Sequence, residues 1–148
     1  MLFKGINDQT VELRILGYQF PEVTTPGDYD ANWLRIYVKV QSQLGHWQTV
    51  DSSLTTWEFK KLISWFKDLS EDREVKYLDL TFMEPCLEFQ LKKTTQSSKT
   101  IRIIFSAELR PKSAPPGKQY YVDCIFTNQD LSDVCMQLEK ELEQTPDR

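Results

Sequence analysis

The stretch LTTWEFKKLISWFKDL, residues 54–69, contains the clearest local signal in the chain. It begins with a capping box, in which the Thr55 hydroxyl can accept the N–H of Glu58 while the Glu58 carboxylate accepts the N–H of Thr55. Leu54 and Phe59 stand at the two positions of a hydrophobic staple. Apolar residues then recur at helical spacing, at Phe59, Leu62, Ile63, Phe66 and Leu69. The pattern predicts an amphipathic helix over residues 55–69.

Segments of alternating apolar and polar residues lie on both sides of this helix, and this alternation is typical of half-buried strands. They cover residues 11–15, 34–41, 47–50, 78–82, 87–91, 101–109 and 120–126. Residues 24–28 are rich in turn-forming types, residues 92–99 predict a hairpin loop, and prolines make residues 111–117 a rigid loop that cannot pair in a sheet. A second capped helix is predicted over residues 129–142, and the tail from about residue 143 is expected to fray.

The order of these elements is strands, helix, strands, helix. The loops between consecutive strands are too short for helical crossovers, so the strands should pair antiparallel. The expected fold class is therefore α+β: a mostly antiparallel, curled sheet, tending toward a sandwich or half-barrel, against which two helices pack. A length of 148 residues and a hydrophobic content of 40% are consistent with a single domain over residues 1–148.

The composition limits the classes of partner. The chain has 18 basic and 22 acidic residues, for a formal net charge of −4, and an acidic surface repels phosphate backbones. Nucleic acid is therefore not expected as a direct ligand. No apolar run approaches the ~20 residues that span a bilayer, and the first residues lack the apolar region of a signal peptide. Three scattered cysteines, Cys86, Cys124 and Cys135, are typical of reduced core thiols. A cytoplasmic protein without membrane association is expected.

Catalytic machinery is hard to assemble from this sequence. His46 is the one histidine, its place beside Gly45 predicts a solvated side chain in a turn, and no Gly-x-Ser-x-Gly elbow supplies a nucleophile. None of the five glycines belongs to a phosphate-binding pattern. Residues 28–32, DYDAN, alternate oxygen-bearing side chains but lack the glycine and the final glutamate of a calcium loop. No enzymatic activity, cofactor or metal site is expected.

Several segments, taken in order, resemble the WapI-type immunity family, small bacterial proteins associated with contact-dependent toxins. The segments are LGYQFP (residues 16–21), DANWL (30–34), DSSLTTWE (51–58, followed by Leu62 and Trp65), EPCL (84–87) and LRP (109–111). They run through most of the chain. The family often has proline directly after the aspartate of the third segment, where this sequence has Ser52, and this departure affects a turn and not the fold.

The resemblance implies a non-enzymatic protein that binds and neutralises a cognate toxin domain made by the same cell. Such toxins are frequently nucleases with basic active sites, to which an acidic inhibitor surface would be complementary. Interface hot spots often combine an aromatic side chain with surrounding charges. The expected contact residues are therefore in acidic loops, with Tyr29 as the aromatic anchor: Asp28, Tyr29, Asp30, Glu84 and Glu88.

Two alternatives stay open at this point. A second acidic run, Glu71-Asp72-Glu74, competes as a contact surface, although such a run at a helix end is ordinarily solvated. The alternative function is a small-molecule or carbohydrate binding module, in which the curled sheet would enclose its ligand in a deep apolar pocket. The sequence does not decide the oligomeric state.

Overall fold

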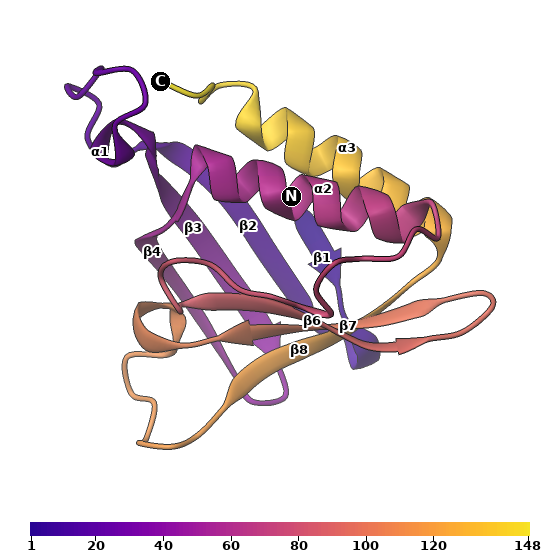
Figure 1. Ribbon diagram of the computed structural model, residues 1–148. Coiled ribbons are helices and arrows are strands. Elements are labelled where there is room, and N and C mark those ends of the chain that lie inside the picture. Colours follow the sequence, from indigo (N-terminus) through magenta and orange to yellow (C-terminus); the bar gives the residue numbers. More distant parts are fainter.

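Eight strands and three α-helices make up the chain in a computed structural model that describes residues 1–148 (Figure 1). The strands are β1 (Leu2–Lys4), β2 (Thr10–Tyr18), β3 (Trp33–Ser42), β4 (Gly45–Thr55), β5 (Asp79–Leu80), β6 (Leu87–Thr94), β7 (Lys99–Phe105) and β8 (Tyr120–Phe126). The helices are α1 (Tyr29–Asn32), α2 (Thr56–Ser70) and α3 (Asn128–Leu142), and two 3-10 turns are η1 (Ile6–Asp8) and η2 (Ala107–Leu109). No helix has the length and apolar character that crossing a bilayer requires.

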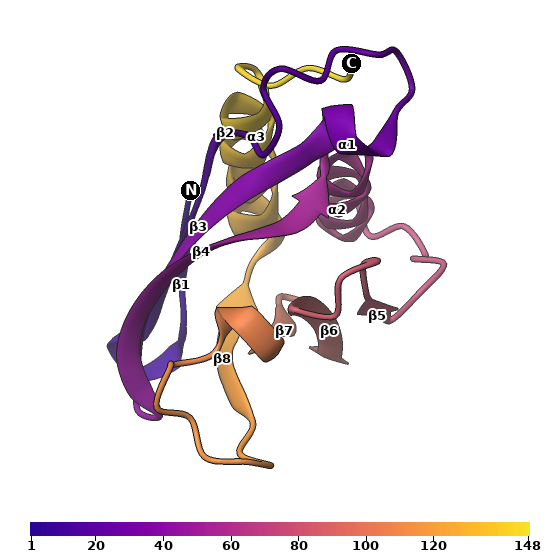
Figure 2. The ribbon, with the colours of Figure 1, turned by 90° about the vertical axis from the view of Figure 1, so that its left-hand side faces the viewer.

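The strands form two four-stranded sheets, one in the order β1-β2-β3-β4 and the other in the order β5-β6-β7-β8. Every neighbouring pair is antiparallel. The structure confirms the α+β class, the antiparallel pairing and the two long packed helices. The strands are divided between two open sheets, and the long helices and the second sheet lie on the same side of the first sheet (Figure 2).

Helix α2 joins the two sheets through one aromatic cluster. The Phe66 ring lies 5.9 Å from Phe3 in the first sheet, and 5.6 Å and 6.3 Å from Phe89 and Phe126 in the second, measured between ring centroids. These side chains belong to a core of 31 buried residues drawn from both sheets and both long helices. Residues 54–69 therefore hold the central position that their apolar stripe predicts.

The long helices begin at the predicted caps. Thr55 Oγ1 accepts the Glu58 N–H at 3.2 Å, and the Glu58 carboxylate accepts the Thr55 N–H at 2.9 Å. In α3, Thr127 Oγ1 accepts the Asp130 N–H at 3.1 Å, and the Asp130 carboxylate accepts the Thr127 N–H at 2.8 Å. Each helix start thus satisfies backbone donors that would otherwise lack a partner.

Two predicted strands are shorter in the structure. The segment 78–82 pairs only at Asp79–Leu80, and Leu78 is 61% exposed. The segment 101–109 ends as a strand at Phe105, because Ala107 adopts a left-handed backbone with φ of 45° and the chain turns into η2. Alternating apolar residues therefore continue beyond the end of each strand.

The region before β3 and the tail also differ from expectation. Residues 29–32 form the short helix α1, although four residues are too few to show helical periodicity. The tail was expected to fray from about residue 143, but the structure places it beside the loop that leads into α1 (Figures 1 and 2). Thr145 is buried in that arrangement, with 3% of its surface exposed.

Candidate functional site

Tyr29 is the exposed aromatic side chain of an acidic turn formed by residues 28–30. Its surface is 54% exposed, and its ring meets Trp57 of α2 edge-on, with centroids 5.1 Å apart and planes at 86°. The Asp28 carboxylate accepts the Asp30 N–H at 3.0 Å and so caps α1. Neither Asp28 nor Asp30 forms an ion pair. The acidic turn therefore presents two unpaired charges beside an aromatic ring whose orientation is fixed by α2.

Asn32 holds the acidic turn in place through hydrogen bonds. Its side chain is fully buried. Its side-chain N–H₂ donates to the carbonyls of Asp28 at 2.8 Å and Arg148 at 2.9 Å. Its side-chain oxygen accepts from Thr56 Oγ1 at 2.9 Å and from the Arg148 N–H at 3.0 Å. A buried amide with both donors and both acceptor positions used is fully satisfied. It joins the turn, the start of α2 and the tail.

Glu84 lies in a second exposed segment that contacts the same end of α2. The N–H of the preceding residue, Met83, donates to the Glu58 carboxylate at 2.6 Å, and Met83 itself is 56% exposed. Glu84 is exposed and forms no ion pair. Trp57 contacts the acidic turn and Glu58 contacts Met83, so both acidic segments lie against the first turn of α2.

Glu88 does not join this group. It lies on β6 between the buried Leu87 and Phe89, so its half-buried side chain projects from the opposite face of the second sheet. Its carboxylate accepts from the Gln90 side-chain amide at 2.6 Å. The structure thus gathers four of the five predicted contact residues, Asp28, Tyr29, Asp30 and Glu84, around the start of α2, and Glu88 stands apart.

In the competing acidic run, Glu71-Asp72-Glu74, the carboxylates of Glu71 and Asp72 bind other residues of the protein. Asp72 accepts from the buried Lys99 ammonium at 2.5 Å and from the Asn128 amide at 2.6 Å, and Lys99 also donates to Asn128 at 2.8 Å. The hydrogen bond from Lys99, followed by that from Asn128, holds the pKa of the Asp72 carboxyl below its usual value. Lys99 is only 4% exposed, and sequence reasoning missed its role because a lysine in a polar loop is ordinarily solvated.

The neighbouring charge of the run is also neutralised. Glu71 forms an ion pair with Arg73, and Asp68 lies 3.5 Å from the same guanidinium. Asp72 ties the end of α2 to β7 and the start of α3, so it has a structural role. The run therefore presents less free negative charge than the sequence suggests, in contrast to the acidic turn.

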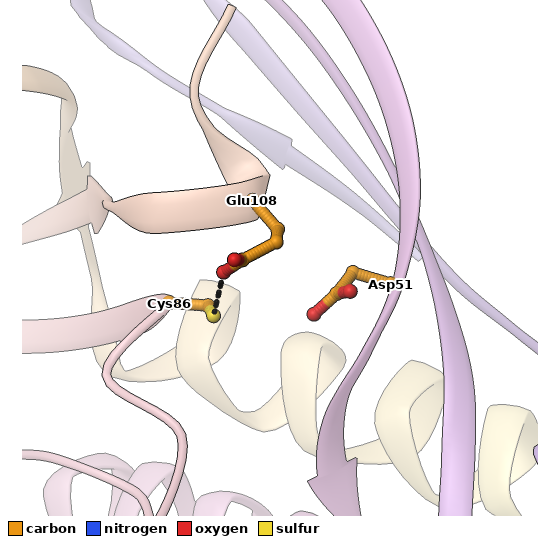
Figure 3. A group of neighbouring side chains, drawn as sticks. All are labelled: Asp51, Cys86 and Glu108. Carbon is orange, nitrogen blue, oxygen red and sulfur yellow. Dashed lines mark hydrogen bonds between the residues drawn. The ribbon is translucent and has the colours of Figure 1, made fainter.

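Asp51, Cys86 and Glu108 come together between the two sheets, with ligand atoms within 4.8 Å of one another (Figure 3). Zinc binds these side-chain types. The Cys86 thiol donates to the Glu108 carboxylate at 3.3 Å, and burial, with this bond, raises the pKa of the thiol to about 12. A metal would require the thiolate. The three residues have no metal-ligand spacing in the sequence, because they lie on separate elements.

His46 lies near the start of β4 and not in the turn itself, opposite Gln41 of β3. Its side chain is exposed, as expected. Its neighbour Trp47 is half-buried, packs edge-on against Phe105 and Tyr120 of the second sheet, and donates to the Leu109 carbonyl at 2.8 Å. Trp47 therefore fixes the contact between the two sheets.

The chain thus has an open, two-sheet α+β fold, and an exposed aromatic ring lies beside unpaired acids on its surface. A model of the Immunity protein WapI-like family matches residues 1–146. The chain belongs to this family, which confirms the resemblance seen in its sequence motifs. Comparison with curated proteins gave no match.

Proposed function

We propose that this protein is a non-enzymatic immunity protein that binds and neutralises a cognate toxin domain through the acidic turn and Glu84. Membership of the immunity family supports the role. The observation that carries the location is the Tyr29–Trp57 contact, because it holds an exposed aromatic ring in place between unpaired carboxylates. Pre-ordered aromatic anchors lose little conformational entropy when a partner binds.

The charge of the surface defines the chemistry of the partner. Asp28, Asp30 and Glu84 carry negative charge without an ion-pair partner, and the whole chain has a formal net charge of −4. Such a surface attracts a basic protein and accelerates its association, an effect that salt weakens. A toxin domain with a basic active-site cleft, such as a nuclease, has the complementary charge.

The surface hollows support a protein partner better than a small ligand. A hollow of about 370 Å³ lies between α2, α3 and the tail and is widely open to solvent; its lining residues are Lys60, Ile63, Glu139, Leu142, Glu143 and Pro146. Another, of about 440 Å³, lies beside Trp65 and Tyr77 and includes three charged residues among its eight, Lys61, Asp68 and Lys76. Both hollows are open, whereas a ligand-binding module would be expected to enclose its ligand in a deep pocket.

The two acids whose pKa is clearly perturbed have structural roles. The pKa values of Asp72 and Asp130 are both lowered, by hydrogen bonds from Lys99 and from the Thr127 backbone respectively. Both acids hold helix ends in place.

The test is calorimetry against the C-terminal domain of the toxin whose gene neighbours this one, at low and moderate salt. The test variant D28N/Y29A/D30N/E84Q should lose binding, and the control E71Q/E74Q, which removes two acids from the competing run, should retain it. Wild-type association should slow as salt rises. Absence of wild-type binding at every salt concentration would reject the partner, and equal losses in both variants would reject the surface.

A further inference from the structure

We propose that Arg148 and Asn32 form a latch that holds the acidic turn in shape from the far end of the chain. The structure assigns these two residues a positioning role; their importance for toxin binding rests on the proposed function. Residues 143–148 run back to the loop before α1, and the two views agree on this placement (Figures 1 and 2).

The Arg148 side chain binds the loop between β2 and α1 directly. Its guanidinium donates to the carbonyls of Pro21 and Val23, each at 3.0 Å. The same guanidinium lies over the Tyr18 ring, 3.5 Å from its centroid. Stacking on an aromatic face and donation to two carbonyls require the planar, multi-donor head of arginine.

The Arg148 main chain makes a second set of contacts. Its carbonyl accepts from the Gly27 N–H at 3.0 Å and from the Asn32 amide at 2.9 Å, and its N–H donates to the Asn32 side-chain oxygen at 3.0 Å. The Asn32 side chain therefore pairs with both backbone groups of Arg148, as a neighbouring strand would. Gly27 directly precedes the acidic turn, so this contact fixes where the turn begins.

The loop has few bonds of its own to replace these contacts. Within it, the Val23 N–H donates to Phe20 and the Asp28 N–H donates to Thr25, and its one backbone bond to a strand is at its start, from the Gln19 N–H to the Trp33 carbonyl at 2.7 Å. Most of its residues are exposed. Loops with little burial and few internal hydrogen bonds open at low free-energy cost. The bonds from Arg148 and Asn32 are thus the main restraint on the backbone that leads into Asp28.

Other residues hold the tail in place. The buried Thr145 hydroxyl donates to the Leu142 carbonyl, and Tyr18 donates its hydroxyl proton to the Pro146 carbonyl. Lys60 of α2 pairs with Asp147 at 2.6 Å. Asn32 also accepts from Thr56 at the start of α2. The latch therefore sets the acidic turn relative to Trp57, against which Tyr29 packs.

Hydrogen exchange on the full chain tests the latch without a partner. In R148A, and in N32D, which replaces the amide donors by oxygen, the Gly27 and Asp30 amides should exchange about tenfold faster, the scale of a lost hydrogen bond. Amides in the middle of α2 should keep their wild-type rates. The control R35A removes an exposed arginine from β3 and should change neither group.

Calorimetry with the same variants separates this inference from the proposed function. R148A should weaken toxin binding about tenfold, as expected when a positioned loop must be ordered on binding. Unchanged exchange at Gly27 in R148A would overturn the latch, and this single variant decides the matter if N32D does not fold. Faster exchange with unchanged affinity would overturn its positioning role. If wild type binds no toxin, the proposed function fails while the exchange result still decides the latch.

Discussion

The Phe66 ring on α2 meets the Phe89 ring on β6 edge-on, with centroids 5.6 Å apart and planes at 83°. Both side chains are fully buried, and the Phe3 ring of β1 lies 5.9 Å from each. The three rings therefore form one aromatic cluster that joins α2 to both sheets. Edge-to-face pairs of this kind add stabilisation beyond the area they bury.

Replacing Phe66 with Ala should lower the free energy of unfolding by about 3–5 kcal/mol, and L62A or F105A by about 2–5 kcal/mol, because each leaves a cavity in the shared core. Urea unfolding followed by tryptophan fluorescence measures the change. The exposed S64A on the same helix should stay within about 0.5 kcal/mol of wild type. Midpoints equal to wild type for the three core variants would show that these side chains do not form the core.

Loss of the first helix cap should have a smaller effect. T55A removes the hydroxyl that accepts the Glu58 N–H, and it should cost about 1 kcal/mol of stability. T55S keeps that hydroxyl and should recover most of the loss. A serine variant as unstable as the alanine variant would show that the hydroxyl is not what matters at this position.

The sequence was sufficient to predict the elements whose signals are local. The capping box at Thr55, the apolar stripe of α2 and the strict alternation along β3 each specify structure within a few neighbouring residues. Alternation does not specify which strands pair, so the division into two sheets was not predictable. The contacts of Trp47 with the second sheet were likewise not predictable, because its partners are distant in the sequence.

The candidate site was also predictable only in part, because some of its contacts join residues that are distant in the sequence. Asp28, Tyr29 and Asp30 were found because they are adjacent, whereas their contact with Trp57 joins residues 28 positions apart. The alternation of side chains along β6 places Glu88 on the face opposite Leu87, but no local pattern shows where that face lies relative to the acidic turn. Arg148 and Asn32 are 116 positions apart in the sequence. Because no local pattern reveals a contact over that separation, the polar tail is expected to fray when the sequence alone is considered.

Stability should fall in acid through Asp72. Hydrogen bonds from Lys99 and Asn128 lower the pKa of this carboxyl below its ordinary value of 3.8. A lowered folded-state pKa contributes stability that is fully present above 3.8 and is lost as the pH falls through the folded value. Asp72 has a left-handed backbone, with φ of 54°, which asparagine also tolerates. D72N, which keeps the shape of the side chain, should therefore be less stable than wild type at pH 6.

The stability gap between D72N and wild type should begin to narrow as the pH falls below about 3.8, where Asp72 of the unfolded chain becomes protonated, and should close at lower pH, once Asp72 of the folded protein is protonated too. Urea unfolding at several pH values gives this profile. The control is D79N, which removes an exposed carboxylate that forms no ion pair. A gap for D72N that stays constant from pH 6 to pH 3 would contradict the assigned bond.

The three cysteines should be unreactive in the folded protein. Burial raises the pKa of Cys86 and Cys124 to about 12 and that of Cys135 to about 11, so the thiolate is scarce at neutral pH. A colorimetric thiol reagent at pH 7.5 should react slowly with native protein and rapidly after denaturation in urea. One equivalent reacting at once with native protein would contradict the packing around one of these thiols.

Growth of bacteria that produce the toxin domain tests the central claim most directly, because neutralisation is what the acidic turn is proposed to achieve. Co-production of wild-type protein or E71Q/E74Q should restore growth, and D28N/Y29A/D30N/E84Q, present at equal level and equally stable, should not. Full protection by this last variant would contradict the account.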